Sequence, residues 1–199
     1  MQTIDLSALI GSRICHDLIS PISAIGNGVE LMQLSGVEQT PEIELIAQSV
    51  KNANARIRFF RIAFGGRGSQ TSISRTEISD ILRTISDGNR LSYDWPMVQD
   101  QPRDNVQLVF LALLCVETAM PFGGSIEIQT HDQNFEIHAT ADRIKIDKDQ
   151  WNALRDRPVT ADLSASHVQF ALLPKHASEA NRQIDVVTDE QSGRIMIRV

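Results

Sequence analysis

His16 and Asp17 are neighbours in the sequence, and their side-chain types suit the transfer of a phosphoryl group. A neutral imidazole keeps a free nitrogen lone pair near pH 7 and can attack phosphorus to form a labile phosphoramidate. A carboxylate beside it can accept the N–H of the other ring nitrogen, which fixes the tautomer and stabilises developing positive charge. His16 is therefore a candidate nucleophile, and Asp17 is its candidate orienting carboxylate. The alternative is an ordinary surface histidine beside a solvated acid.

The helix that must carry His16 is predicted over residues 4–34. Its apolar residues recur at helical spacing and cover about a third of the helix circumference at ~100° per residue. These residues are Ile10, Ile14, Leu18, Ile22, Ile25, Val29 and Met32. His16 lies opposite this stripe, on the side of Ser20 and Ser23, so we expect its ring to face outwards. Pro21 removes one backbone hydrogen bond and loosens the turn that bears His16, unless it is only a tolerated kink.

A heptad pattern predicts a second helix from Pro41 to Phe64. Its apolar residues are spaced alternately by three and four positions, at Ile43, Ile46, Val50, Ala53, Ile57, Phe60 and Phe64. Thr40 is a suitable N-cap, and Gly65 and Gly66 end the helix. Two long helices with a short connection predict an antiparallel hairpin.

A single hairpin of this kind has more apolar surface than it can bury by itself. Leu45, Phe59 and Ile62 make the second helix apolar on more than one line. We therefore expect a homodimer that forms a four-helix bundle. The expected interface residues are Ile43, Ile46, Val50, Ile57 and Phe60. The alternative is a hairpin that packs against the rest of its own chain.

The pattern changes to alternating strands and helices after a predicted linker at residues 65–70. Strands are expected near residues 71–74, 90–95, 125–130, 134–140, 183–189 and 194–199, and helices near 76–86, 103–120, 148–155 and 166–181. This order predicts an α+β fold with helices on one face of a mixed sheet. We expect two domains, a helical hairpin for dimerisation and phosphotransfer at 1–66 and an α/β sandwich at 71–199.

Composition narrows the function classes. The 199 residues include 42% hydrophobic residues and carry a net charge of −6, which fits a globular protein and argues against nucleic acid as the main partner. The longest apolar run, Val106–Val116, is too short for a membrane helix of ~20 residues, and the N-terminus lacks the basic start of a signal peptide. Cys15 and Cys115 are too few for a disulfide framework or a metal knuckle. We expect a cytoplasmic protein with no membrane contact.

The segment RICHDLISPISAI at residues 13–25 resembles the phosphoacceptor box of two-component histidine kinases. The matching positions are His16, Asp17, Pro21, Ala24 and Ile25. In those kinases the hairpin precedes an ATP-binding domain, and residues 107–128 resemble the N-box of that domain, including its Pro-x-Gly-Gly turn into a strand.

The residues that bind nucleotide in such kinases are missing. Aligned on the two glycines of the turn, the asparagines of the N-box fall at Leu111 and Cys115, and its lysine falls at Thr118. Residues 141–145 read ADRIK where a DxGxG motif would follow, and no GxGLG lid motif occurs. The second domain thus resembles a degenerate histidine-kinase ATPase domain, and we expect no ATP binding and no cofactor held by the chain.

A histidine box followed by a degenerate ATPase domain is the layout of the ChpT-type histidine phosphotransferases of alphaproteobacteria, which this chain resembles over most of its length. Weaker matches follow in the same order, at residues 61–65, 93–95, 119–124 and 168–173. The resemblance implies a dimeric phosphotransferase that takes a phosphoryl group from the receiver domain of a hybrid histidine kinase and passes it to response regulators. In that family the recipients govern cell-cycle transcription and regulated proteolysis, and the partner receiver would supply Mg²⁺.

Two other functions are weighed against this one. A non-enzymatic dimeric pseudokinase could bind a receiver domain and sequester it. An active ATP-dependent kinase is disfavoured by the missing motifs.

Basic residues are expected around His16. Both helices rise ~1.5 Å per residue, so the hairpin brings His16 level with about Arg61, with Arg58 within a turn and Arg13 a turn earlier on the first helix. Such a basic rim would steer the acidic pocket of a receiver, so Arg13, Arg58 and Arg61, with Ser20, Pro21 and Ser23, are our candidate partner-binding residues. The alternative is that the arginines of the second helix only complement its C-terminal dipole.

Overall fold

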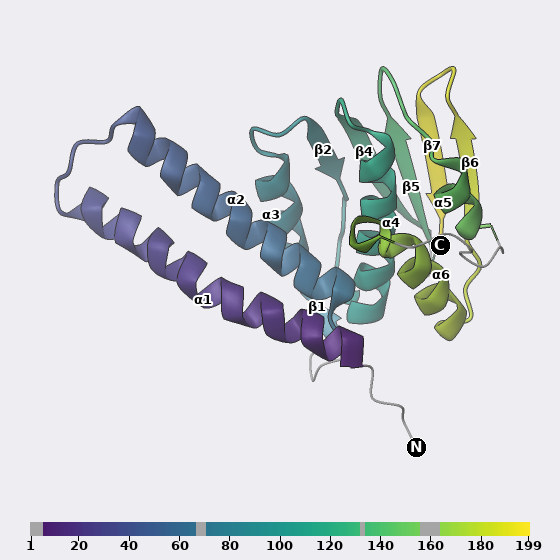
Figure 1. Ribbon diagram of the computed structural model, residues 1–199, viewed down its shortest axis with the longest axis horizontal. Coiled ribbons are helices and arrows are strands. Elements are labelled where there is room, and N and C mark those ends of the chain that lie inside the picture. Colours follow the sequence, from purple (N-terminus) through teal and green to yellow (C-terminus); the bar gives the residue numbers. More distant parts are fainter. Residues whose placement is uncertain (1–5, 67–70, 132–133, 156–163) are drawn as a thin grey trace.

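The structure, a computed structural model, describes residues 6–66, 71–131, 134–155 and 164–199. Helices α1 (Leu6–Leu34) and α2 (Pro41–Phe64) form an antiparallel hairpin that projects from an α/β body, residues 71–199 (Figure 1). The bounds of α2 are those predicted, because Pro41 at its first position and Gly65 at its C-cap mark the two ends. Among the described residues, no helix is long and apolar enough to cross a lipid bilayer.

The α/β body follows the expected order of strands and helices, with one additional two-residue strand, β3 (Gln101–Pro102). Its elements are β1 (Ser72–Ile73), α3 (Arg75–Ser86), β2 (Leu91–Asp94), β3 (Gln101–Pro102), α4 (Arg103–Ala119), β4 (Gly124–His131), β5 (Asn134–Thr140), α5 (Lys148–Ala153), a 3₁₀ turn (Ala165–His167), α6 (Gln169–Glu179), β6 (Asp185–Asp189) and β7 (Arg194–Arg198). The main sheet has the order β2-β4-β5-β7-β6, with β2 parallel to β4 and the other pairs antiparallel. The predicted α+β fold with a mixed sheet is confirmed.

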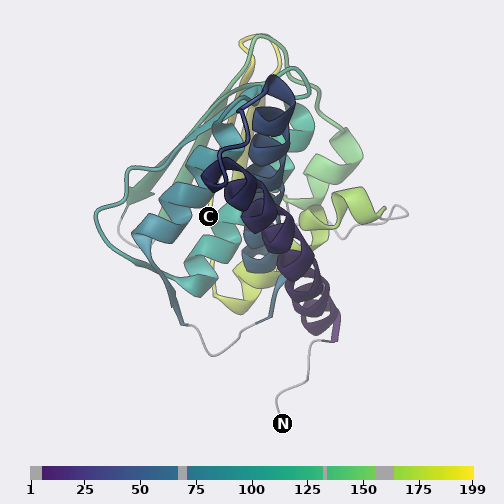
Figure 2. The ribbon, with the colours of Figure 1, turned by 90° about the vertical axis from the view of Figure 1, so that its left-hand side faces the viewer.

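Helices cover one face of this sheet. Alternate residues of the central strands are buried on that face, as in β5, where Phe135, Ile137 and Ala139 point into the core. The core continues through α4, whose apolar residues are buried around the whole helix. Figure 2 looks onto the tip of the hairpin, with the α/β body behind it.

The turn from α4 into β4 needs glycine at two positions. Gly123 has a φ of +95°, and a Cβ there would collide with the carbonyl oxygen of Arg90. Gly124 has a φ of +146°, and its N–H donates to that same carbonyl at 3.0 Å. The Pro-x-Gly-Gly motif therefore lets β4 start close beside β2.

Helix α2 belongs to the core of the α/β body as well as to the hairpin. Its buried residues Ala55, Phe59, Ile62 and Ala63 join one continuous core with α4. Phe59 and Ile62 had suggested a larger dimer surface, and here they are covered by the chain's own α/β body. For this face of α2 the alternative, packing on the same chain, is therefore correct. The division into domains at 1–66 and 71–199 stays an interpretation of the sequence, and residues 67–70 of the predicted linker lie outside the described residues.

Candidate functional site

His16 lies on the solvent side of α1, with 81% of its side chain exposed. Its Nδ1 atom is 3.1 Å from Oδ1 of Asp17, and Nε of Arg13 donates to Oδ2 of Asp17 at 2.7 Å. Asp17 is thus held from both sides, one helical turn from Arg13 and next to His16. Among the described residues, no side chain is hydrogen-bonded to Nε2 of His16.

The charge of Asp17 determines which nitrogen of the His16 imidazole carries the proton. The hydrogen bond with His16, and then the one from Arg13, hold the pKa of the Asp17 carboxyl below its ordinary value. An ionised carboxylate only accepts hydrogen bonds, so Nδ1 of a neutral His16 must be the donor. The lone pair of the ring then lies on Nε2, the nitrogen available to an incoming group.

The remaining predicted residues of α1 lie near His16 in different ways. Pro21 lies inside α1 and has no N–H to donate to the carbonyl of Asp17, four residues earlier. Ser20 is exposed, whereas Ser23 is half-buried and lines a groove of about 470 Å³ between α1 and α2. Ser23 is about 20° from His16 around the helix, so the groove opens on the same side of the hairpin as His16.

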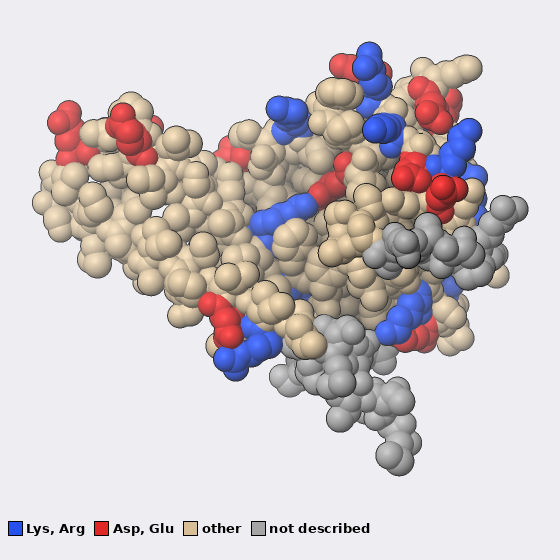
Figure 3. All heavy atoms as spheres, in the orientation of Figure 1, with Lys and Arg blue, Asp and Glu red and all other residues tan. Residues whose placement is uncertain are grey.

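The apolar stripe of α1 faces the other side of the hairpin. Ile10, Ile14, Leu18, Ile25 and Met32 are between 44% and 60% exposed. Val29 is buried and Ile22 is half-buried, since these two turn towards α2. In Figure 3 the surface along α1 is uncharged over most of its length, with acidic side chains at the tip of the hairpin and a basic and acidic pair towards its other end.

The expected level of His16 along the hairpin is nearly correct. Gly11 lies beside Phe64, and a Cβ on Gly26 would lie 3.2 Å from Cγ1 of Val50. Counting along both helices from these contacts places His16 level with Phe59 and Phe60, one or two residues before the predicted Arg61. The contact with Gly26 also shows that Val50, predicted for the dimer interface, packs within the hairpin.

Arg58 and Arg61 are engaged with α3. Their Nη2 atoms lie 3.4 Å and 3.8 Å from Oε1 of Glu77. The structure thus brings Arg13 to the His16–Asp17 pair and directs the two arginines of α2 to a neighbouring helix. Their role in binding a partner stays a prediction.

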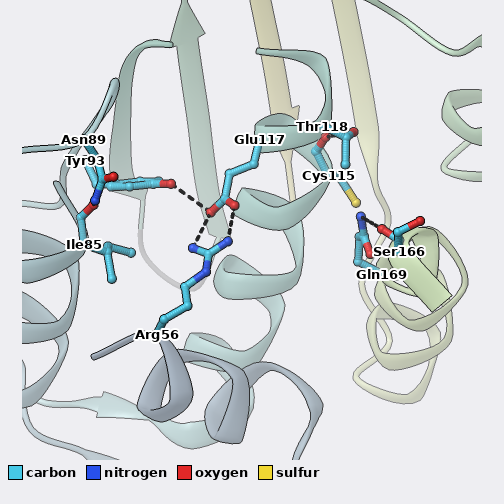
Figure 4. Close-up of polar contacts among 9 residues, drawn as sticks. All are labelled: Arg56, Ile85, Asn89, Tyr93, Cys115, Glu117, Thr118, Ser166 and Gln169. Carbon is cyan, nitrogen blue, oxygen red and sulfur yellow. Dashed lines mark hydrogen bonds and ion pairs between the residues drawn. The ribbon is translucent and has the colours of Figure 1, made fainter. Parts of the chain in front are cut away.

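A polar network that the sequence analysis missed joins the hairpin to the α/β body (Figure 4). Arg56 of α2 makes a two-pronged ion pair with Glu117 of α4, with Nη1 and Oε1 at 3.0 Å, and Tyr93 of β2 donates to Oε1 at 2.8 Å. The network lines a cleft of about 610 Å³. Burial alone would lower the pKa of Arg56, but Glu117 outweighs burial and raises it, and burial raises the pKa of Tyr93.

Sequence spacing gave no warning of this network, because Arg56 and Glu117 are 61 residues apart. One local signal was available. Arg56 is a charged residue among the aromatic residues of α2, and its guanidinium lies 5.1 Å and 4.9 Å from the ring centres of Phe59 and Phe60. A charge so placed needs a carboxylate partner from another element.

The positions of the two N-box asparagines are part of the core. Leu111 and Cys115 have no exposed surface, and burial raises the pKa of the Cys115 thiol. Thr118, at the lysine position, donates its hydroxyl to the carbonyl of Cys115 at 2.7 Å. Leu111 and Cys115 have no side-chain oxygen that could act as a ligand of a Mg²⁺–nucleotide. That the chain does not bind ATP stays a prediction. Within the described residues, no group of three or more His, Cys, Asp and Glu side chains is placed to hold a metal ion.

Comparisons with known proteins agree on one family. The family model described as the histidine phosphotransferase C-terminal domain matches residues 75–192, more than half of the chain. Over 131 residues the chain is 36% identical to protein phosphotransferase ChpT of Brucella abortus (strain 2308), a match that covers 65% of this chain and 62% of the relative. A solved 1.7 Å structure of a bacterial phosphotransferase is 25% identical, with a TM-score of 0.68, and the match covers 100% of this chain and 97% of that chain.

Proposed function

The chain belongs to the histidine phosphotransferase family, and we propose on this basis that it is a phosphorelay protein that carries the phosphoryl group on His16. One observation carries the assignment of the residue. His16 is exposed on α1, and Asp17 binds its Nδ1, so that Nε2 faces solvent with its lone pair. A transferring partner can therefore reach the nucleophile without any rearrangement of the helix.

The proposed reaction is a transfer between an aspartate and a histidine. The Nε2 lone pair of neutral His16 attacks phosphorus in the aspartyl phosphate of a receiver domain, and a P–N bond forms as the P–O bond breaks. The aspartate leaves as a carboxylate. The imidazole keeps its proton on Nδ1 and gains a positive charge, which the carboxylate of Asp17 stabilises through the hydrogen bond between them. Transfer to a second receiver reverses these steps.

The partners proposed for this reaction are receiver domains. A receiver domain of a hybrid histidine kinase donates the phosphoryl group, and response regulators, including regulators of the cell cycle, accept it. Mg²⁺ bound by the receiver would neutralise charge on the transferring group. The groove that Ser23 lines lies on the same side of the hairpin as His16 and provides a docking surface next to the nucleophile. Arg13 is the basic residue already in place at this site.

The proposed working form is a homodimer. The exposed residues Ile10, Ile14, Leu18, Ile25 and Met32 form a continuous apolar stripe on the side of α1 opposite His16. A second copy would cover this stripe in a four-helix bundle and leave both His16 side chains outside it. Dimerisation and phosphotransfer thus use opposite faces of the same helix.

The test is a transfer assay with receiver domains of the source organism charged with acetyl phosphate. We expect the protein to take up phosphate that is labile in acid and stable in base, and we expect His16→Ala to abolish the uptake. The matched control is His138→Ala, which removes a histidine from β5 and should transfer at the wild-type rate. A pseudokinase that only sequesters a receiver would bind the charged receiver without taking up phosphate.

A further inference from the structure

The hairpin is supported unevenly along its length. The buried residues of α2, Ala55, Phe59, Ile62 and Ala63, all lie in its C-terminal half. Near the tip of the hairpin, Leu45 is 69% exposed and no residue of α2 before Ala55 is buried. The α/β body therefore buries residues in one half of α2 and contacts the other half more sparsely, as in the hydrogen bond from Gln48 to Asp87.

The supported half is the half that lies level with the phosphoacceptor. His16 is level with Phe59 and Phe60, as the contacts of Gly11 and Gly26 with α2 establish. Cys15, next to His16, is only 8% exposed. On the far side of α2, the ring of Phe59 stacks on that of Phe110 with ring centres 4.2 Å apart and planes 5° apart. Behind His16 there is thus a continuous packed layer from α1 through α2 to α4.

Polar contacts from α4 hold the same stretch of α2. Arg103 donates to the carbonyl of Arg61 at 3.0 Å, and Gln107 donates to the carbonyls of Ala63 and Gly65 at 3.1 Å and 3.0 Å. These carbonyls lie at the end of α2, where the last carbonyls of a helix run out of intrahelical donors. The carbonyl of Arg61 also accepts the backbone N–H of Gly65 at 3.2 Å. Side chains of α4 thus provide the C-terminal cap of α2.

The ion pair of Arg56 with Glu117 adds a third tie, one turn from Phe59 (Figure 4). It is the tie best placed to be removed without opening the apolar core, since Arg56 keeps 33% of its side chain exposed. Tyr93 donates to the same carboxylate and so fixes Glu117 from the sheet side.

We propose that the α/β body rigidifies the part of the hairpin that carries the phosphoacceptor, with Arg56 and Glu117 as positioning residues for the transfer step. The inference rests on the proposed function. Phosphoryl transfer depends on an in-line arrangement of nucleophile, phosphorus and leaving group. Helix α1 lacks the backbone hydrogen bond from Pro21 to Asp17, and this weakens the helix about one turn after His16. The C-terminal half of α2, which is packed on the α/β body, supplies the stiffness that is lost there.

The test removes the charge of Arg56 and follows both motion and transfer. In Arg56→Gln we expect amide hydrogen exchange over residues 12–20 and 57–64 to rise on the order of 10-fold, because local opening becomes easier. The maximal transfer rate from a charged receiver should fall roughly 3- to 10-fold, while the receiver concentration at half-maximal rate stays within about twofold. The reversed pair, Arg56→Glu with Glu117→Arg, should recover part of both losses.

The matched control is Arg198→Gln, which breaks the ion pair of Arg198 with Glu136 in the sheet. It should change neither exchange in α1 nor transfer. If Arg56→Gln unfolds the protein, Tyr93→Phe keeps the ion pair and removes one hydrogen bond, and a smaller change in the same direction is expected.

Wild-type exchange in α1 for a folded Arg56→Gln or Tyr93→Phe variant would overturn the proposal. A loss of transfer only through weaker receiver binding would also overturn it. If the wild-type protein takes up no phosphate at all, the proposed function fails. The exchange measurement then still decides whether the α/β body rigidifies the hairpin around His16.

Discussion

The hairpin and the α/β body differ in how far their apolar side chains are buried. Every apolar residue of α4 from Val106 to Val116 is at most 7% exposed, whereas five residues of the α1 stripe are 44–60% exposed. The chemistry follows the same division. His16 is on the surface of the hairpin, and the body positions that resemble a nucleotide site, Leu111 and Cys115, are sealed in the core.

This difference shows where the molecule exposes surface that other molecules can contact. The α/β body buries most of its apolar side chains in one core with part of α2, and Val98, Phe122 and Val187 are its exposed exceptions. The hairpin leaves apolar area exposed on one side and His16, the proposed phosphoacceptor, exposed on the other, so both of these faces are suited to meet other molecules. A change in the centre of the body's core should therefore act mainly on stability, and a change on an exposed face of the hairpin should act on assembly or transfer.

The largest expected effect is a change in the centre of the body. Leu111→Asn restores an N-box residue type but buries an amide that finds no partner among apolar neighbours. We expect a loss of about 3–5 kcal/mol of unfolding free energy, and no gain of nucleotide binding. Denaturant unfolding and calorimetry with Mg-ATP measure the two outcomes. A variant as stable as wild type, or one with micromolar affinity for ATP, would contradict the view that this region serves only as core.

The second prediction concerns the apolar stripe of the hairpin. Leu18→Asp places a charge where the second copy is expected to pack, and burying it there costs several kcal/mol, so the dimer should weaken by roughly 100-fold or more. Sedimentation measures the dissociation constant, and circular dichroism should show an intact monomer because Leu18 is 47% exposed in a single chain. Val50→Asp is a useful contrast, since Val50 packs on Gly26 and its change should disturb the hairpin itself. A wild-type protein that sediments as a monomer at micromolar concentration would be evidence against the dimer.

The third prediction separates orientation from stability at the site. Asp17→Asn keeps the size of the side chain but removes the charge that stabilises a phosphorylated imidazole, so uptake of phosphate should slow roughly 10- to 100-fold. The melting temperature should hardly change, because Asp17 is half exposed. Single-turnover transfer and a thermal melt provide the two readouts. An unchanged transfer rate would mean that Asp17 is only a solvated acid.

The smallest expected effect is on the titration of Asp17. Its pKa in the folded protein is lowered by the hydrogen bond with His16 first and by Arg13 second. The hydrogen bonds that the carboxylate accepts are therefore fully present at pH values above its ordinary pKa and are lost as the pH falls through the lowered pKa. We therefore expect no titration of Asp17 between pH 5 and 7. Carboxyl NMR should show a larger upward shift of its midpoint in His16→Ala than in Arg13→Ala. The reverse order would show that Arg13 is the main partner.

The sequence predicted elements well where local signals and burial agree. The bounds of α2 followed from Pro41 and Gly65, and β5 from its alternating apolar residues. The two-residue strand β3 escaped prediction because its pairing with β1 depends on a neighbour 29 residues away. The outward position of His16 was expected from helical periodicity, and its contact with Asp17 was expected because a carboxylate and an imidazole are neighbours in the chain.

Contacts between elements were less predictable. Phe59 and Ile62 form an apolar line on α2 that fits a second copy or the chain's own body equally well, and only the tertiary structure decides between them. Arg58 and Arg61 lie near the predicted level, but their partner Glu77 comes from α3, which periodicity cannot place beside α2. The direction in which a long charged side chain turns depends on such neighbours.

The capping of α2 by α4 has a consequence for synthesis of the chain. Helix α2 ends at Phe64 and α4 at Ala119, 55 residues later. Ribosomes add ~5–20 residues per second, so a delay on the order of several seconds separates the two helices as they are made. During this interval Phe59 lacks Phe110, the last carbonyls of α2 lack Arg103 and Gln107, and the newly made hairpin exposes an apolar face that chaperones of nascent chains can bind. The hairpin is synthesised before the α/β body, and the contacts that cap α2 form once α4 has left the ribosome.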